Sequence, residues 1–145
     1  KVGAILSNKE IKEKEALEFY GKNLGLTFQI ADDTLDYNSE LKFFGKKTGK
    51  DFFEGKITLP VILLFQNITS IEKNKLKDIF KQDIRSDEDL KFTLMLIKKY
   101  NIIKECYKKA EHFINLASNS LTVFKDSDEK KNLENLTSFS LERSF

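Results

Sequence analysis

The chain has 145 residues, of which 40% are apolar and 33% are charged, as is typical of one folded domain rather than of a disordered chain. Its net charge is only +2, and lysines alternate with acidic residues, which excludes a basic stripe for binding nucleic acid. A single cysteine excludes an internal disulfide, and no apolar run is long enough for a transmembrane segment. Since no signal peptide is visible either, we expect a cytoplasmic protein.

Helices are favoured over a turn-rich sheet because the chain has only one proline and six glycines. Residues 7–10 have the form of a capping box, which predicts that a long helix begins at Ser7. Gly21 and Gly25 lie four residues apart on this helix and predict the close approach of another helix. One stripe of the helix is formed by apolar residues that recur every three or four positions, Leu17, Tyr20, Leu24, Phe28, Ala31 and Leu35.

The next segment, residues 37–56, has no such periodicity and contains three glycines, so we predict a loop. A short apolar helix is expected to begin at residues 58–60, because proline is tolerated in a first turn. The loop therefore connects two helices.

Three further helices are predicted in the remainder of the chain. Residues 86–89 form a second capping box, and the helix that follows it is predicted to break near Asn101. The next helix carries an apolar stripe from Ile103 to Leu121, and Ser127 is placed to cap a last helix through Phe139. No strand pattern competes with these helices, so the predicted fold class is all-α.

Three aspartates, Asp32, Asp33 and Asp36, lie near the end of the first long helix. Asp32 and Asp36 share a face, where like charges repel and the negative end of the helix dipole adds to the cost. A bound cation would relieve this repulsion, and since only oxygen donors are nearby, the candidate is Mg²⁺ rather than Zn²⁺. The alternative is a hydrated acidic face with no ligand, because acidic clusters are common on helix surfaces.

Lysines follow the aspartates closely in the predicted loop, among them Lys46, Lys47, Lys50 and Lys56. Ammonium groups suit the oxygens of a diphosphate, and the neighbouring glycines allow the backbone to approach closely. The alternative is an ordinary basic surface loop. Carboxylates, a metal ion and lysines together form a common physical means of holding a diphosphate leaving group.

The chain resembles the trans-isoprenyl (polyprenyl) diphosphate synthases in three stretches, Gly25 to Asp36, Gly45 to Asp51 and Glu54 to Pro60. Residues 28–36 are similar to the second aspartate-rich motif of that family, and residues 45–60 to the lysine loop behind it. Residues 124–143 are similar to the C-terminus of the long-chain octaprenyl and solanesyl members. The resemblance implies an isoprenoid synthase-type helical bundle, of which residues 1–145 are the C-terminal part of a single domain.

By this resemblance, the enzyme condenses an allylic diphosphate with isopentenyl diphosphate repeatedly, and makes a long-chain polyprenyl diphosphate for a quinone side chain. The family holds the allylic diphosphate through Mg²⁺ ions between two aspartate-rich motifs. Asp32 would ligate Mg²⁺ directly, and Asp33 and Asp36 would act mainly through metal-bound water. The residues expected to contact the substrate are Lys46, Lys56, Gln29 and Phe28.

The family's first aspartate-rich motif is absent from these 145 residues. We therefore expect the chain to be inactive alone, and to function either in the homodimer of the full-length family or paired with an N-terminal half. A non-catalytic helical partner subunit, or a decayed fragment of such a synthase, is the alternative. A third possibility is another diphosphate-ionising enzyme such as a terpene cyclase, which the sequence of residues 45–60 disfavours.

Overall fold

The computed structural model describes residues 2–38 and 48–142, and every regular element in these two ranges is helical, which confirms the all-α prediction. The chain divides into two compact units, one built from residues 1–29 and 108–145 and the other from residues 30–107. The elements are α1 (Val2–Leu6), α2 (Ile11–Tyr37), α3 (Lys50–Phe53), α4 (Leu59–Asn67), α5 (Ser70–Lys81), α6 (Asp87–Lys99), α7 (Ile102–Ser120), the 3₁₀ turn η2 (Leu121–Val123) and α8 (Asp128–Glu142).

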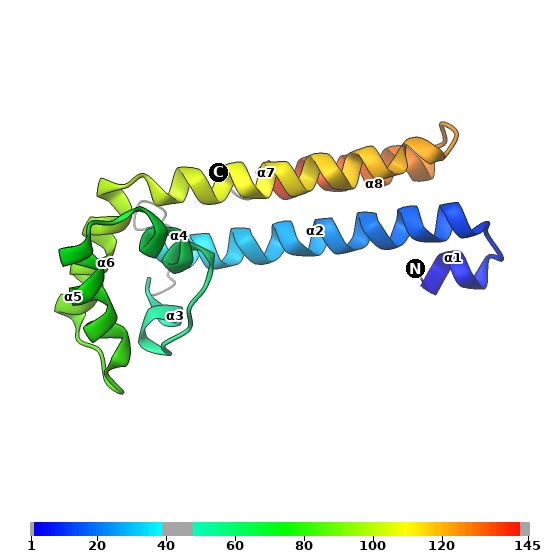
Figure 1. Ribbon diagram of the computed structural model, residues 1–145. Helices are drawn as coiled ribbons and strands as arrows, with labels where there is room; N and C mark the ends of the chain where they lie inside the picture. The colour runs from blue at the N-terminus through cyan, green and yellow to red at the C-terminus, as the bar shows by residue number, and fades with distance from the viewer. Residues whose placement is uncertain (1, 39–47, 143–145) are drawn as a thin grey trace. The chain divides into compact units, whose positions relative to one another are not determined.

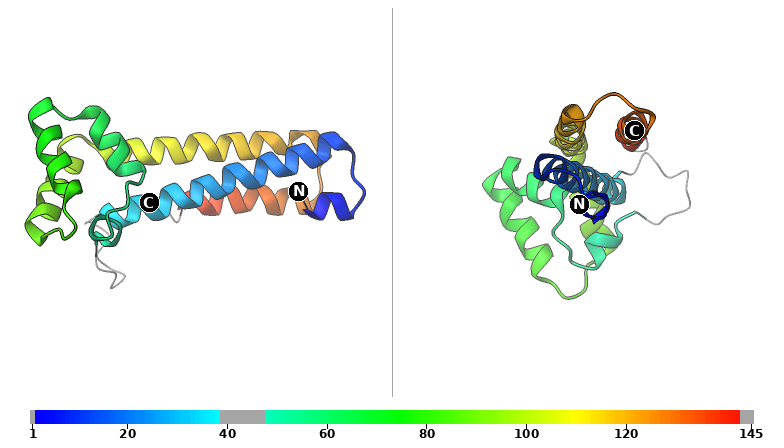
Figure 2. Two further views of the ribbon diagram at one scale, coloured as in Figure 1. Left: turned by 60° about the horizontal axis from the view of Figure 1, so that its bottom comes forward. Right: turned by 90° about the vertical axis from the view of Figure 1, so that its right-hand side faces the viewer.

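The first unit contains α1, the first part of α2, most of α7, and α8, with its long helices side by side (Figures 1 and 2). The hydroxyl of Tyr20 donates a hydrogen bond to the backbone carbonyl of Leu133 at 2.8 Å and so joins α2 to α8. Burial of apolar side chains from α2, α7 and η2 stabilises this unit. The buried core residues are Tyr20, Leu24, Ile114, Ala117 and Leu121.

The long helix begins later than the sequence predicts. The Ser7 hydroxyl donates to the backbone carbonyl of Gly3 at 2.8 Å, so Ser7 closes α1 instead of capping α2. Asn8 then adopts a left-handed backbone conformation, with φ of 51°. At the start of α2, the Glu13 carboxylate accepts the N–H of Glu10 at 3.1 Å. The predicted cap at Ser7 is wrong because a separate short helix precedes this turn.

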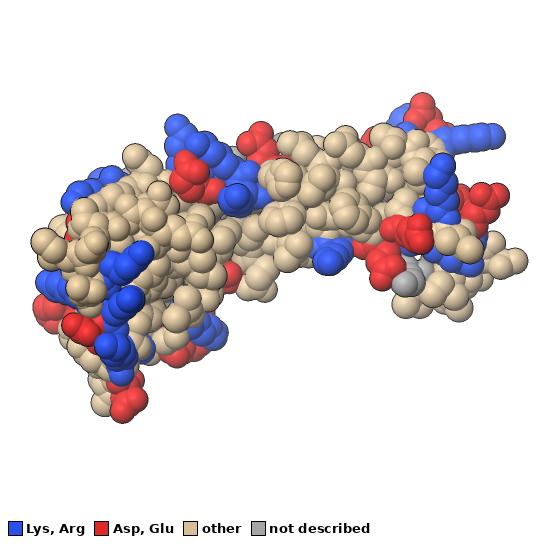
Figure 3. Space-filling model, in the orientation of Figure 1, with Lys and Arg blue, Asp and Glu red and all other residues tan. Residues whose placement is uncertain are grey.

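One face of α2 in this unit is uncovered by the described residues. No described atom outside the helix lies within 4 Å of a Cβ built at Gly21 or at Gly25, so among the described residues the predicted close approach of another helix is not found. Phe19 and Leu26, on the same helix, are exposed. Figure 3 shows uncharged side chains along α2 and α7.

The second unit gathers α3, α4, α5 and α6 around the end of α2 and the start of α7 (Figure 1). Helix α4 begins after Thr58 with Pro60 in its first turn, as predicted. Although α4 is apolar, no helix in the described ranges has the length and hydropathy needed to cross a membrane. The largest fully buried apolar side chains of this unit are Tyr37, Phe52, Val61, Leu64, Leu76, Leu96, Ile97 and Ile102.

Part of the segment predicted as a loop is helical, because Lys50–Phe53 form α3. The Phe52 side chain of α3 is completely buried, with its ring edge-to-face against Phe80 at 5.5 Å between centroids. Gly49 precedes α3 with φ of 91°. The burial of one aromatic ring thus orders a segment whose sequence has no periodic pattern.

The other predicted helix boundaries are confirmed. Ser86 and Asp89 form the predicted capping box of α6. Asn101 has φ of 52° and separates α6 from α7. The Ser127 hydroxyl accepts the N–H of Lys130 at 3.2 Å at the start of α8. These signals succeed because each depends only on neighbouring residues.

Glu72 links the start of α5 to the end of α6. Its carboxylate accepts hydrogen bonds from the Lys99 ammonium at 2.8 Å and from the Tyr100 hydroxyl at 2.6 Å. It also accepts the N–H of Thr69 at 3.0 Å. These donors, Lys99 first, lower the pKa of the Glu72 carboxyl to about 2.

We expect Glu72→Gln to lower the free energy of unfolding at pH 7. A carboxyl whose pKa is lowered on folding adds stability above its unfolded pKa, here near 4.5, and this stability is lost as the pH falls toward 2. The difference in the free energy of unfolding between the unaltered chain and Glu72→Gln should therefore shrink as the pH falls from 4.5 toward 2. Urea unfolding at several pH values measures it, and a difference that stays constant would show that the carboxylate charge is not its source.

A side chain at Gly49 is expected to destabilise the second unit. A Cβ there would lie 2.7 Å from Leu90 Cδ2, and Gly49→Ala should cost about 1–2 kcal/mol for the left-handed backbone alone. Gly21→Ala is the matched control, because the position is helical and open, and should stabilise the chain by up to about 1 kcal/mol. Urea unfolding compares the two variants, and effects of the same sign would contradict this account.

Candidate functional site

The three aspartates predicted to hold a metal lie in the last turns of α2, within the second unit. Asp32 is exposed, whereas Asp33 and Asp36 are half-buried. Phe28 and Gln29, the predicted pocket residues, are exposed on the same helix but belong to the first unit. The second unit therefore holds the acidic part of the predicted site.

The Asp36 carboxylate is bound by the backbone at the start of α3. Its Oδ1 accepts the N–H of Lys50 at 3.0 Å, and its Oδ2 accepts the N–H of Asp51 at 2.8 Å. The backbone carbonyl of Asp36 also accepts the N–H of Gly49 at 2.9 Å. Burial raises the pKa of the Asp36 carboxyl, and the N–H donors of Asp51 and Lys50 oppose this effect.

The predicted diphosphate ligand Lys56 lies just after α3 and is paired with two carboxylates. Its ammonium is 2.6 Å from Glu54 Oε2 and 3.1 Å from Asp51 Oδ1. Glu54, and then Asp51, raise the pKa of Lys56, so the ammonium remains charged at neutral pH. Lys46 and Lys47 lie outside the residues that the structure describes. The structure thus brings Asp36, Asp51 and Lys56 into one chain of contacts.

Tyr37 is a buried residue beside this cluster that the sequence did not single out. Its side chain is 1% exposed. Burial, followed by the nearby carboxylates of Asp36 and Asp51, raises the pKa of the Tyr37 hydroxyl. The hydroxyl therefore stays protonated at neutral pH. Its position next to Asp36 is the only signal that the sequence offers.

Arg85 supports the turn that carries Lys56, a role that no sequence pattern predicts. Gly55 has φ of 73°, and the guanidinium of Arg85 lies 3.0 Å from the position that a Cβ of Gly55 would take. Arg85 Nη2 donates to the backbone carbonyl of Phe80 at 2.8 Å. The Arg85 cation also lies over the Phe80 ring, 5.3 Å from its centroid. A side chain at Gly55 would therefore be strained by the left-handed backbone and would have to displace the Arg85 guanidinium.

The described residues fit a magnesium ion held by few protein ligands. Among them, no three carboxylate, histidine or cysteine side chains gather closely enough to hold a metal ion. Asp32 nevertheless presents exposed carboxylate oxygens, and Mg²⁺ needs only one or two carboxylates when water and phosphate complete its shell. Asp36 is a poorer donor, because backbone N–H groups already occupy both of its oxygens.

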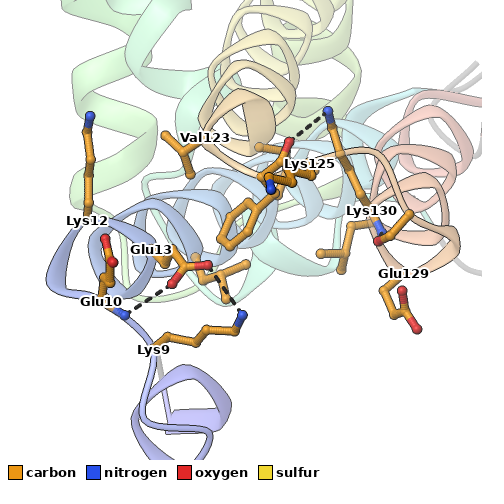
Figure 4. A pocket seen from close by; sticks show the side chains of 13 residues that line it. Lys9, Glu10, Lys12, Glu13, Val123, Lys125, Glu129 and Lys130 are labelled. Carbon is orange, nitrogen blue, oxygen red and sulfur yellow. Dashed lines mark hydrogen bonds and ion pairs between the residues drawn. The ribbon is translucent and has the colours of Figure 1, made fainter.

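The first unit contains an open cavity of about 720 Å³ between the start of α2, η2 and the start of α8 (Figure 4). Apolar side chains such as Leu17 and Phe124 line it, and charged residues surround it. Lys9 lies 3.4 Å from Glu13, and Lys130 donates to Asp126 at 2.9 Å. Because Lys9 and Lys130 at the rim are paired with acidic side chains, we expect the cavity to bind anions more weakly than its lysines alone would suggest.

Residues 1–97 match the polyprenyl synthetase family. The chain is 32% identical over 143 residues to the chloroplastic solanesyl diphosphate synthase 2 of Arabidopsis thaliana, a match that covers 99% of this chain and 33% of that protein. It is 33% identical over 144 residues to a short chain isoprenyl diphosphate synthase of Methanothermobacter thermautotrophicus, and covers 43% of it.

Solved structures of two related synthases are similar to nearly the whole chain. A decaprenyl diphosphate synthase from Rhodobacter capsulatus is similar with a TM-score of 0.90 and 30% identity, over 99% of this chain and 44% of that one. A polyprenyl synthase from Caulobacter crescentus, crystallised with calcium and isoprenyl diphosphate, has a TM-score of 0.86 and 31% identity over the same shares. The chain spans less than half the length of each of these relatives.

Proposed function

Because this chain belongs to the polyprenyl synthetase family and corresponds to the C-terminal half of such a synthase, we propose that it supplies half of a prenyltransferase active site. The enzyme would join an allylic diphosphate to isopentenyl diphosphate. The observation that carries the proposal is the chain of contacts from Asp36, next to the other two aspartates at the end of α2, through Asp51 of α3 to Lys56. This arrangement places carboxylates and an ammonium group on adjoining segments.

Asp32 and Asp33 would hold Mg²⁺, which when bound would offset the charge of a diphosphate leaving group. The Lys56 ammonium would leave Glu54 and Asp51 and bind diphosphate oxygens instead, since it is charged and its side chain is about half-exposed. Lys46 would provide a second ammonium, and Phe28 and Gln29 would line the pocket. The calcium and isoprenyl diphosphate crystallised with the Caulobacter crescentus relative support a divalent cation and a diphosphate as the bound species.

The product would be a long-chain polyprenyl diphosphate, such as a quinone side chain requires. Similarity to a solanesyl and to a decaprenyl diphosphate synthase supports this length. The short chain relative from Methanothermobacter thermautotrophicus is equally similar in sequence, so analysis of the product is the test.

A complete active site would need a second polypeptide segment that carries the first aspartate-rich motif, in a homodimer of full-length chains or as a separate N-terminal half. The uncovered face of α2, with Phe19 and Leu26 exposed and Gly21 and Gly25 open, favours such a partner. The same observation supports the second candidate function, a non-catalytic helical subunit that binds a synthase chain.

Prenyl transfer by the purified chain tests the proposal, with farnesyl diphosphate, radiolabelled isopentenyl diphosphate and Mg²⁺. We expect no extractable product from the chain alone, and product when an N-terminal half with the first aspartate-rich motif is added. Asp32→Ala should lower that restored activity by at least about a hundredfold, because oriented charge at a leaving group typically contributes that much. Asp83→Ala, which removes an exposed aspartate elsewhere in the second unit, should leave it unchanged.

Two results would contradict this account. Product from the chain alone would show that one aspartate-rich motif suffices. Binding of the N-terminal half without restored activity would favour the non-catalytic subunit. Chromatography of the restored product measures the length of its prenyl chain.

A further inference from the structure

We propose that Asp36 is a positioning residue, whose carboxylate fixes the start of α3 and thereby places the ammonium of Lys56. The inference rests on the proposed function only in treating Lys56 as a ligand of diphosphate. It assigns to the third aspartate of the motif a role different from that of Asp32.

The start of α3 lacks a side-chain cap of its own. Gly49 occupies the capping position and has no side chain to accept the N–H groups of the first turn. Such groups need an acceptor, since they have no partner within the helix. The carboxylate of Asp36 provides it, with one oxygen for Lys50 and the other for Asp51. Asp36 thus caps a helix from 14 residues away along the chain.

The second step leads from α3 to Lys56. The backbone carbonyl of Asp51 accepts the N–H of Lys56 at 2.9 Å, and its carboxylate lies 3.1 Å from the Lys56 ammonium. Two contacts therefore tie Lys56 to the residue whose own N–H is held by Asp36. Release of the Asp36 carboxylate would loosen Asp51 and, with it, both contacts to Lys56.

Asp32 lies one turn earlier on the same face of α2 and does not cap α3. It is exposed, and within the described ranges no side chain or backbone group donates a hydrogen bond to its carboxylate. Substitutions at these two positions remove the same charge from the same helix. Asp32 is therefore the matched control for Asp36.

Exchange of individual backbone amides, followed by NMR on the full 145-residue chain, tests the first step. Asp36→Ala should speed exchange at Lys50 and Asp51 by about tenfold to a hundredfold, the usual effect of losing a hydrogen bond to a charged group. Asp36→Asn should retain protection at one of the two amides, because its amide oxygen still accepts a hydrogen bond. Asp32→Ala should change the exchange rates of these two amides by no more than about twofold. Unchanged exchange in Asp36→Ala would overturn the proposal.

Binding of inorganic diphosphate in the presence of Mn²⁺ tests the second step. Asp36→Ala and Lys56→Ala should each weaken binding by about tenfold, and the double variant should be scarcely weaker than either, because both changes remove one interaction. Additive losses would overturn the link between the two residues.

The conservative variants separate positioning from metal ligation. Asp36→Asn should bind diphosphate within about threefold of the unaltered chain, whereas Asp32→Asn should lose about tenfold or more, since an amide is a poor ligand for a hard cation. Equal losses would mean that Asp36 acts on the metal. If the unaltered chain bound no diphosphate even with an N-terminal half, the proposed function would fail, while amide exchange would still decide whether Asp36 holds α3.

Discussion

The negative charge at the end of α2 must be compensated by neighbouring groups, and the structure around it follows from this requirement. Three aspartates stand in its last turns, where the carbonyl end of the helix is already negative. The charge of Asp36 is compensated by the backbone, because two N–H groups of α3 donate hydrogen bonds to its carboxylate. At Asp32 no described group does so, and this difference supports the proposal that Asp32 holds the cation.

The second unit holds residues 49–56 at two points, Phe52 and Gly55. The ring of Phe52 is buried against Phe80, so α3 is part of the hydrophobic core. The guanidinium of Arg85, which also lies over the Phe80 ring, packs closely against Gly55. A lysine placed directly after Gly55 is therefore attached to a well-packed scaffold. Its carboxylate partners, Glu54 and Asp51, are both partly exposed to solvent.

Sequence patterns predicted what neighbouring residues determine, including the capping box at residues 86–89 and the break at Asn101. The aspartates and Lys56 were also predicted to be site residues, because their types and order resemble a motif. The position of α3 was missed, since it depends on burial of Phe52 and on a carboxylate fourteen residues earlier. The cap at Ser7 failed for a related reason, as the same short pattern can close one helix or open the next.

The bond between Asp36 and the start of α3 also determines where the chain tolerates a change of length. Residues 49–56 leave no room for an added or missing residue, because Gly49, Asp51 and Gly55 each have a fixed backbone or side-chain partner. An insertion or deletion between Gly49 and Lys56 would move the N–H groups of α3 away from the Asp36 carboxylate, or Lys56 away from Asp51.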